Sequence, residues 1–133
     1  MKTSIGLSIQ KSGQLTSIEF YHKRTEFKKI AKLSDQELSI GVAILFGRIA
    51  VFTGLKGGID DFIKQDILNG LVTNHRHLSL EEIEYAFCLD RDGVYGEPTN
   101  HYQFINREYV GRVLKKYYTW LDGQRQIHRI PVR

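Results

Sequence analysis

The stretch "LSDQELSIGVAILFGRIAVFTG", residues 33–54, decides the fold class of this chain. Ser34, followed three residues later by Glu37, has the spacing of a capping box, and Gly54 stands where a left-handed residue ends a helix. Between these signals, apolar side chains point in almost every direction around a helix. A helix that is apolar on all sides must be covered by neighbours. We therefore expect residues 35–53 to form a central helix with the other helices packed around it.

Arg48 lies inside this apolar segment. A charge at such a place is either functional or neutralised by a partner within the fold. A partly buried ion pair with a carboxylate such as Glu82 or Glu84 explains it better than a free functional cation.

Four further helices are predicted. Residues 17–32 have high helix propensity, and residues 59–73 carry apolar side chains at the i, i+3, i+4 spacing of an amphipathic helix. Ser79 and Glu82 form a second capping box, which predicts a short helix ending near residue 89. Asn106 is a suitable cap for a last helix that ends before Gly123.

The two ends of the chain give weaker signals. Within residues 1–16, apolar and polar side chains alternate and a turn-like "KSGQ" follows, which predicts an arm or a short edge strand. Residues 124–133 are basic and contain Pro131, which predicts an extended tail. The expected architecture is a single all-α domain of about five helices over residues 17–123, flanked by an N-terminal arm and a C-terminal tail.

Composition narrows the class of protein. With 133 residues, 41% of them apolar and 26% charged, the chain is typical of one globular domain and not of a disordered protein. Cys88 is the only cysteine, so no internal disulfide forms and a reducing cytoplasm is the expected location. The best apolar run, Ile40 to Phe52, is short for a bilayer and contains Arg48, so we expect no membrane partner. A formal charge of +4 gives a mild attraction for nucleic acid or acidic proteins.

Motifs for catalysis or metal binding fail on spacing. A calcium loop starting at Asp90 would need a carboxylate where His101 stands, and the "KGG" at residues 56–58 lacks the order of a phosphate-binding loop. His75 and His77 would need further ligands from elsewhere to hold a metal. Cys88 lies in an apolar helical pattern that needs it for packing. We therefore predict a non-enzyme without metal or cofactor.

The segment "HYQFINREYVGRVLKKYYTWLDG", residues 101–123, is the best candidate for a binding surface. Along the last helix an apolar arc faces inward, whereas Arg112, Lys115 and Lys116 lie on the opposite side, with Tyr109 and Trp120 at the border. Cations can neutralise phosphates while aromatic rings stack on bases. The alternative is equally sound chemically: the rings cap the edge of the core, and the cations form a solvated face.

Residues 78–121 resemble a group of small helical proteins of bacteriophages and prophages. The shared elements are an "EI..AF" helix, a glycine-containing loop with "YGE", an "HYQ" turn into a helix with "EYV", and "VL.KY..W". In this sequence they correspond to Glu82–Phe87, Tyr95–Glu97, His101–Phe104 with Asn106 and Glu108–Val110, and Val113–Trp120. Such proteins are sometimes likened to helicase loaders and other replication accessory factors. The resemblance implies a non-catalytic role in the bacterial host cell.

Charge placement and this resemblance together predict an accessory protein that contacts nucleic acid or a replication protein. The expected contact residues are His101, Tyr102, Arg112, Lys115, Lys116, Trp120 and Arg125. Two alternatives stay open. One is a structural protein that assembles into a homo-oligomer through the terminal segments "TSIGLSI" and "QIHRIPVR". The other is an inhibitor of a host defence or replication enzyme.

Overall fold

The structure, a computed structural model, describes residues 4–101 and 103–129 and is all-helical over that part of the chain. Two short 3-10 turns, η1 and η2, and one isolated bridge between Lys29 and Ser79 are the other regular features. The helices are α1 (Ser4–Ser12), α2 (Ser17–Lys23), α3 (Asp35–Thr53), α4 (Asp61–Asn74), α5 (Leu80–Arg91) and α6 (Arg107–Arg129). The prediction of an all-α fold is confirmed.

The signals that predicted the starts of α3, α5 and α6 and the end of α3 are confirmed. The Ser34 hydroxyl accepts from the Glu37 amide at 3.1 Å, the Glu37 carboxylate accepts from the Ser34 amide at 3.0 Å, and Gly54 adopts φ 67°. Ser79 and Glu82 make the same reciprocal contacts at the start of α5. The Asn106 side chain accepts from the Tyr109 amide at 2.8 Å and so caps α6. These contacts are local, which is why sequence spacing alone predicts them.

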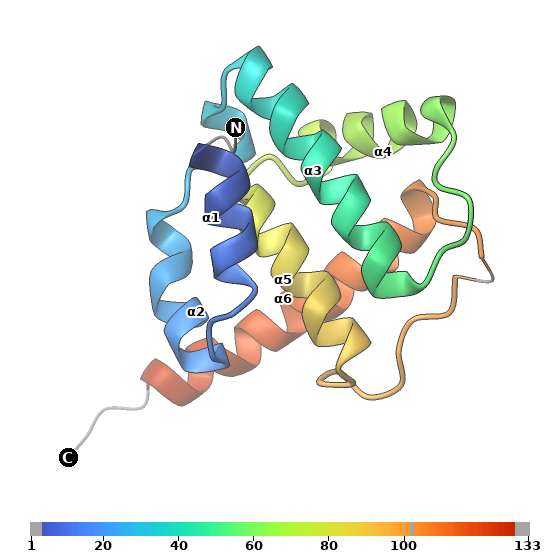
Figure 1. Cartoon of the computed structure of the whole chain (residues 1–133). Coiled ribbons are helices and arrows are strands. Elements are labelled where there is room, and N and C mark those ends of the chain that lie inside the picture. Colours follow the sequence, from blue (N-terminus) through green and yellow to red (C-terminus); the bar gives the residue numbers. More distant parts are fainter. Residues whose placement is uncertain (1–3, 102, 130–133) are drawn as a thin grey trace.

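The central helix is α5, and the prediction that α3 takes this position was wrong. Every residue from Leu80 to Asp90 is buried. In Figure 1, α5 (yellow) lies in the middle of the bundle, with α1 and α3 packed on it and α6 crossing behind it. α5 is buried despite four carboxylates because each has a partner within the fold, as the predicted Arg48–Glu84 ion pair shows.

α3 is covered on one side only. Its inward stripe includes Val42, Leu45 and Ile49, which pack against α5 and α1. The opposite side is exposed at Ala43, Gly47 and Val51, of which Val51 is 77% exposed. Among the described helices, α3 alone is long and apolar enough to cross a membrane, a property shared by core helices of soluble proteins. An apolar helix face therefore reaches the surface.

Residues 4–16 are not an arm, and residues 1–3 of the predicted arm lie outside the described residues. α1 packs on α3 and α5, Ile9 is fully buried, and the Ser8 hydroxyl donates to the buried Glu81 carboxylate. The alternating pattern misled the prediction because the helical state depends on burial against residues far away in the sequence. Ile9 belongs to the same core as Leu121, so residues 4–16 are part of the helical domain.

The predicted C-terminal tail is also helical as far as the structure describes it. α6 runs to Arg129, beyond the predicted end at Gly123. The His128 ring stacks on Tyr21 of α2 with centroids 4.7 Å apart, which ties this end of the helix to the bundle. Residues 130–133 of the predicted tail lie outside the described residues.

The predicted helix over residues 17–32 is shorter than expected. α2 ends at Lys23, and residues 24–32 continue as η1 (Arg24–Glu26) and η2 (Ile30–Lys32). The Ile30 amide donates to the carbonyl of Leu78 at 2.8 Å, and the Ala31 amide donates to that of Arg76 at 3.0 Å. The backbone bonds to this neighbouring segment in place of a helical turn.

Candidate functional site

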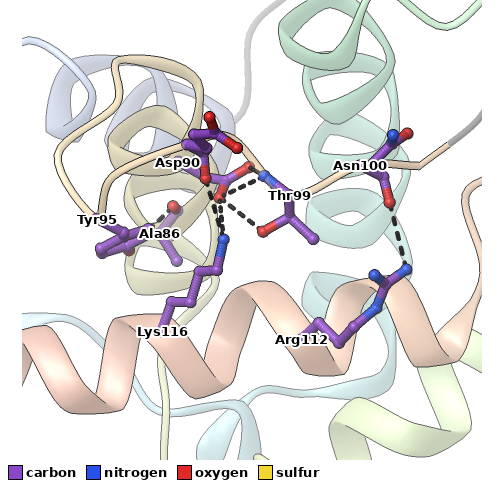
Figure 2. A network of polar contacts seen from close by, with 8 residues as sticks. Ala86, Asp90, Tyr95, Thr99, Asn100, Arg112 and Lys116 are labelled. Atoms are coloured by element: carbon purple, nitrogen blue, oxygen red, sulfur yellow. Dashed lines mark hydrogen bonds and ion pairs between the residues drawn. The ribbon is translucent and has the colours of Figure 1, made fainter.

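Loop 92–106, between α5 and α6, is the longest irregular connection in the described chain. Loops of about 12–15 residues or more without secondary structure are usually either disordered or functional. This loop is held in one shape by polar contacts along its length, as Figure 2 shows for its central part. Its polar contacts make it a candidate for the functional class of long loops.

The main anchor is Asp90, near the end of α5. Its buried carboxylate accepts from the Thr99 amide at 3.1 Å and from the Thr99 hydroxyl at 2.8 Å. Lys116 on α6 places its ammonium 3.7 Å from the same carboxylate. Figure 2 shows the three side chains converging between the loop and the two helices. The cation compensates the buried charge, so the loop is fixed without an unpaired carboxylate.

Two α6 cations also bind loop carbonyls. The Lys116 ammonium donates to the carbonyl of Glu97 at 3.2 Å, and the Arg112 guanidinium donates to that of Asn100 at 3.3 Å. Because these donors face the loop, they satisfy carbonyl groups of an irregular backbone that has no helix or sheet partners. Arg112 also lies 3.9 Å from Glu108, one helical turn earlier.

His101 connects the loop to the end of α3. Its Nδ1 accepts from the Gln103 amide at 2.9 Å, so Nε2 carries the proton and donates to the carbonyl of Thr53 at 2.8 Å. Gln103 adopts φ 62° and accepts from the Lys56 amide at 3.0 Å through its side chain. A residue other than glycine at positive φ is uncommon, and such conformations concentrate at functional sites.

Tyr95 adds a hydrogen bond between the loop and α5. The Tyr95 hydroxyl donates to the carbonyl of Ala86 at 3.1 Å, and burial raises the pKa of Tyr95 far above its ordinary value. Burial also raises the pKa of Tyr109 to about 12. Both phenols therefore remain protonated at neutral pH and act as neutral donors and packing groups.

A cleft of about 330 Å³ opens between this loop and the ends of α3 and α5. Its apolar lining comes from Phe52, Phe87 and Tyr109, and its polar lining includes Arg91 and His101. The Arg91 guanidinium lies 4.7 Å from the centre of the Phe52 ring. The volume is at the lower end for ligand pockets, so the cleft fits one side chain or one planar ring better than a large ligand.

The outward side of the loop is apolar at two points. Phe104 is 54% exposed and Val94 is 50% exposed, although both belong to a loop whose backbone is firmly held. An exposed phenylalanine on a fixed loop loses little conformational entropy when it binds. Phe104 is one of the positions that match the phage-protein pattern, but it was not among the predicted contact residues.

The residues predicted from the sequence do not form one surface. His101, Arg112 and Lys116 come together, but they face inward to hold the loop. Lys115 is exposed and has no partner among the described residues. Arg125 pairs with Asp122 and lies about 15 Å further along the helix axis than Lys115. Tyr102 lies outside the described residues.

The two aromatic residues expected at the border of α6 belong to the core. Tyr109 is buried, and Trp120 is half-buried with its ring 5.8 Å from that of Tyr117. The ring of Trp120 also lies 6.2 Å from that of Tyr85 on α5. The alternative interpretation, that these rings close the edge of the core, is therefore correct for both residues.

His75 and His77 pack on an aromatic side chain. His75 Nδ1 lies 2.6 Å from the Tyr118 hydroxyl, and the His77 ring stacks on the same tyrosine with centroids 5.7 Å apart. Burial is the main cause that lowers the pKa of His75, followed by the charges of His77 and Arg107. No group of three or more metal-ligating side chains occurs within residues 4–101 and 103–129.

The fold and this loop define the class of protein: a helical bundle that presents an anchored surface loop beside a small cleft. Comparison with family models, with curated proteins and with solved structures gives no match to this chain. The function must therefore be argued from the residues themselves.

Proposed function

We propose that this chain is a non-catalytic accessory protein that binds a partner protein with the outer side of loop 92–106. The observation that carries the proposal is the contrast between the two sides of the loop. Its inner side is fixed by Asp90, Arg112 and Lys116, whereas Phe104 stands exposed on the outer side. A loop fixed in advance binds with a smaller entropic cost than a flexible one.

The chemistry of the outer side favours a protein partner. Apolar and aromatic side chains are frequent anchors of protein interfaces, and Phe104 and Val94 supply exposed apolar groups on this side of the loop. Most α6 cations already bind groups of their own chain, which leaves little free positive charge for phosphates. A partner protein therefore fits this surface better than nucleic acid.

Several features support a binding role over catalysis. Burial raises the pKa of the Cys88 thiol, so it stays protonated and unreactive at neutral pH. Asp90 is occupied by Thr99 and Lys116 and is not positioned as a free base. The resemblance to phage proteins suggests that the partner is a replication protein in the bacterial cytoplasm, and this setting is part of the proposal.

Photo-crosslinking tests the proposal in cells that make the protein. A photoreactive phenylalanine analogue replaces Phe104 in one variant and Ile18 in a matched control, because Ile18 is similarly exposed but lies on α2. We expect a discrete crosslinked species from position 104 that is absent from position 18. The same species from both positions, or none from position 104, contradicts a role for the loop.

A second candidate function, nucleic-acid binding, is favoured by Lys115, an exposed cation on α6 whose ammonium has no ion-pair partner among the described residues. Binding to single- and double-stranded oligonucleotides across a salt series tests it. Lys115→Glu should lower affinity and reduce the salt dependence by about one ion, whereas Lys32→Glu, an exposed control on η2, should not. Lys116 is unsuitable for this test because it holds Asp90. Absent binding at low salt, or equal losses in both variants, excludes this candidate.

A further inference from the structure

A groove separates the first halves of α3 and α4. α3 packs on α5 and α1, whereas α4 packs on α6, so the two helices diverge on the outside of the bundle. The groove has a volume of about 430 Å³. Its apolar lining comes from Leu38, Val42, Phe46 and Leu68. It shares no lining residue with the cleft beside loop 92–106.

The surface around this groove is unusually apolar. Phe62, in the first turn of α4, is 88% exposed although the helical spacing suggested an inward position. On the α3 side, Ala43, Gly47 and Val51 are exposed, and nothing lies within 4 Å of the position of a Cβ at Gly47. Exposed apolar residues on both helices that border a groove are typical of an interaction site.

The groove also carries both signs of charge. Asp35 and Asp61 line it together with Lys64. The Lys64 ammonium is 3.9 Å from the Asp61 carboxylate, and the side chain of Asp61 is 98% exposed, so this pair is loose and available for other partners. A surface with both signs can complement a copy of itself, because each cation can face the other copy's carboxylate.

We propose that a second copy of this chain covers the α3–α4 groove and forms a two-fold symmetric dimer. In such a contact each surface meets the same surface of its partner, so a protruding group and a receiving groove on one chain are both used twice. Phe62 of each copy enters the groove of the other, and Lys64 pairs with Asp35 of the other copy. The short side chains at Ala43 and Gly47 let the two α3 helices approach closely.

The dimer also explains the distribution of apolar residues in α3. Its sequence is apolar around nearly the whole circumference, but the single chain covers one side. The second copy supplies the missing cover. This contact differs from the extended terminal segments considered from the sequence, since both described termini are helical and packed on the bundle.

Light scattering coupled to size exclusion tests the proposal over a range of concentrations. We expect about twice the 15.4 kDa of one chain for the unmodified protein. Phe62→Ser should weaken the dimer about 30-fold, as removal of a central aromatic contact does, and shift the mass toward one chain. Phe104→Ser is the matched control, because this phenylalanine is also exposed but belongs to the loop. It should leave the mass unchanged.

A charge exchange tests the geometry of the contact. Lys64→Glu should weaken the dimer, and adding Asp35→Lys to the same chain should restore it, because the pair is rebuilt with opposite signs. Helical circular dichroism identifies any variant that fails to fold. Such a variant is replaced by Phe62→Lys, which changes only an exposed side chain.

Three results would overturn the proposal: one chain's mass at all concentrations, dissociation by Phe104→Ser to the same extent as by Phe62→Ser, or binding of the monomer to neutral lipid vesicles through α3. A monomer at all concentrations leaves the crosslink from position 104 unaffected, and a crosslinked species of twice the mass of one chain would be a self-contact, so failure of the dimer and failure of the proposed loop function can be told apart.

Discussion

The ion pair between Arg48 of α3 and Glu84 of α5 leads to a quantitative prediction. Glu84 is fully buried, and its Oε2 has no hydrogen-bond partner among the described residues. Its Oε1 accepts from Nε of Arg48, whose side chain is 32% exposed. The arginine therefore keeps contact with solvent, whereas the carboxylate depends on the arginine. Removing the arginine should therefore lower the unfolding free energy more than removing the charge of the carboxylate.

Arg48→Met retains the aliphatic stem but leaves a buried carboxylate without its cation. Breaking a buried pair in this way costs about 3–5 kcal/mol. For a chain of this size the melting temperature should fall by about 10–20 °C. Glu84→Gln leaves a neutral acceptor beside a partly solvated cation and should cost about 1–2 kcal/mol. The double variant should cost less than the sum of the two, with a coupling free energy of about 1.5 kcal/mol or more.

Urea unfolding of the four proteins, followed by circular dichroism, measures these free energies. The series should be made in the Phe62→Ser background, so that self-association does not contribute to the measured stability. An Arg48→Met variant within about 1 kcal/mol of its parent would refute the reasoning, because it would mean that Glu84 does not depend on Arg48. Strictly additive free-energy changes for Arg48→Met and Glu84→Gln would also refute the reasoning.

Three other predictions concern single positions. Burial raises the pKa of Glu81 above its ordinary value of 4.5, so the contribution of this group to stability is fully present below pH 4.5 and is lost as the pH rises through the folded pKa. Glu81→Gln should therefore raise the melting temperature at pH 8, and the difference from the parent should disappear near pH 4. Asp90→Ala should lower the unfolding free energy by about 2 kcal/mol and accelerate protease cleavage within loop 92–106; unchanged cleavage would argue against its anchoring role. In the Phe62→Ser background, Gly47→Ala should stabilise by about 0.5–1 kcal/mol in urea unfolding, because in the single chain the added methyl meets open space in a helix, whereas Gly54→Ala at φ 67° should destabilise by about 1 kcal/mol. Equal signs for the two glycines would show that backbone conformation does not decide these effects.

Local signals in the sequence predicted local structure well. The capping residues Ser34, Ser79 and Asn106 act within a few positions of themselves, and their helices begin where the spacing indicates. The pairing of Arg48 with a carboxylate of α5 was also foreseeable, since a charge in an apolar helix needs a counter-charge. The spacing gave the correct type of partner, and the structure identifies it as Glu84.

The central position of α5 could not be predicted from its own sequence. Its carboxylates suggested a helix with a solvated face, yet Glu81 binds Ser8, Glu82 accepts from the Tyr117 hydroxyl at 2.7 Å, and Asp90 binds Thr99. Most of these partners lie far away along the chain. Charge alone does not show whether a carboxylate has a polar partner in a distant segment. The sequence therefore favoured the more apolar α3 as the central helix of the bundle.

The sequence identified several residues of the candidate site but did not show which way their side chains point. His101, Arg112 and Lys116 were selected because a histidine and two cations beside aromatic rings resemble a binding surface. In the structure they donate to backbone carbonyls or neutralise a buried carboxylate. These acceptors exist only after the loop has folded, so the spacing of residues gives no sign of them. The outward position of Phe104 also depends on the folded shape of the loop, so the spacing of residues could not predict it.

The burial of α5 also has a consequence for how the protein is made. Residues from α1, α3 and α6 all pack on α5, so its surroundings come from parts of the chain synthesised before it and after it. A ribosome that has released residues up to 91 exposes an α5 whose α6-facing side is still uncovered. The α6-facing side of α5 is covered only after segment 107–129 has emerged, so we expect apolar surface of α5 to stay exposed between these two points of synthesis.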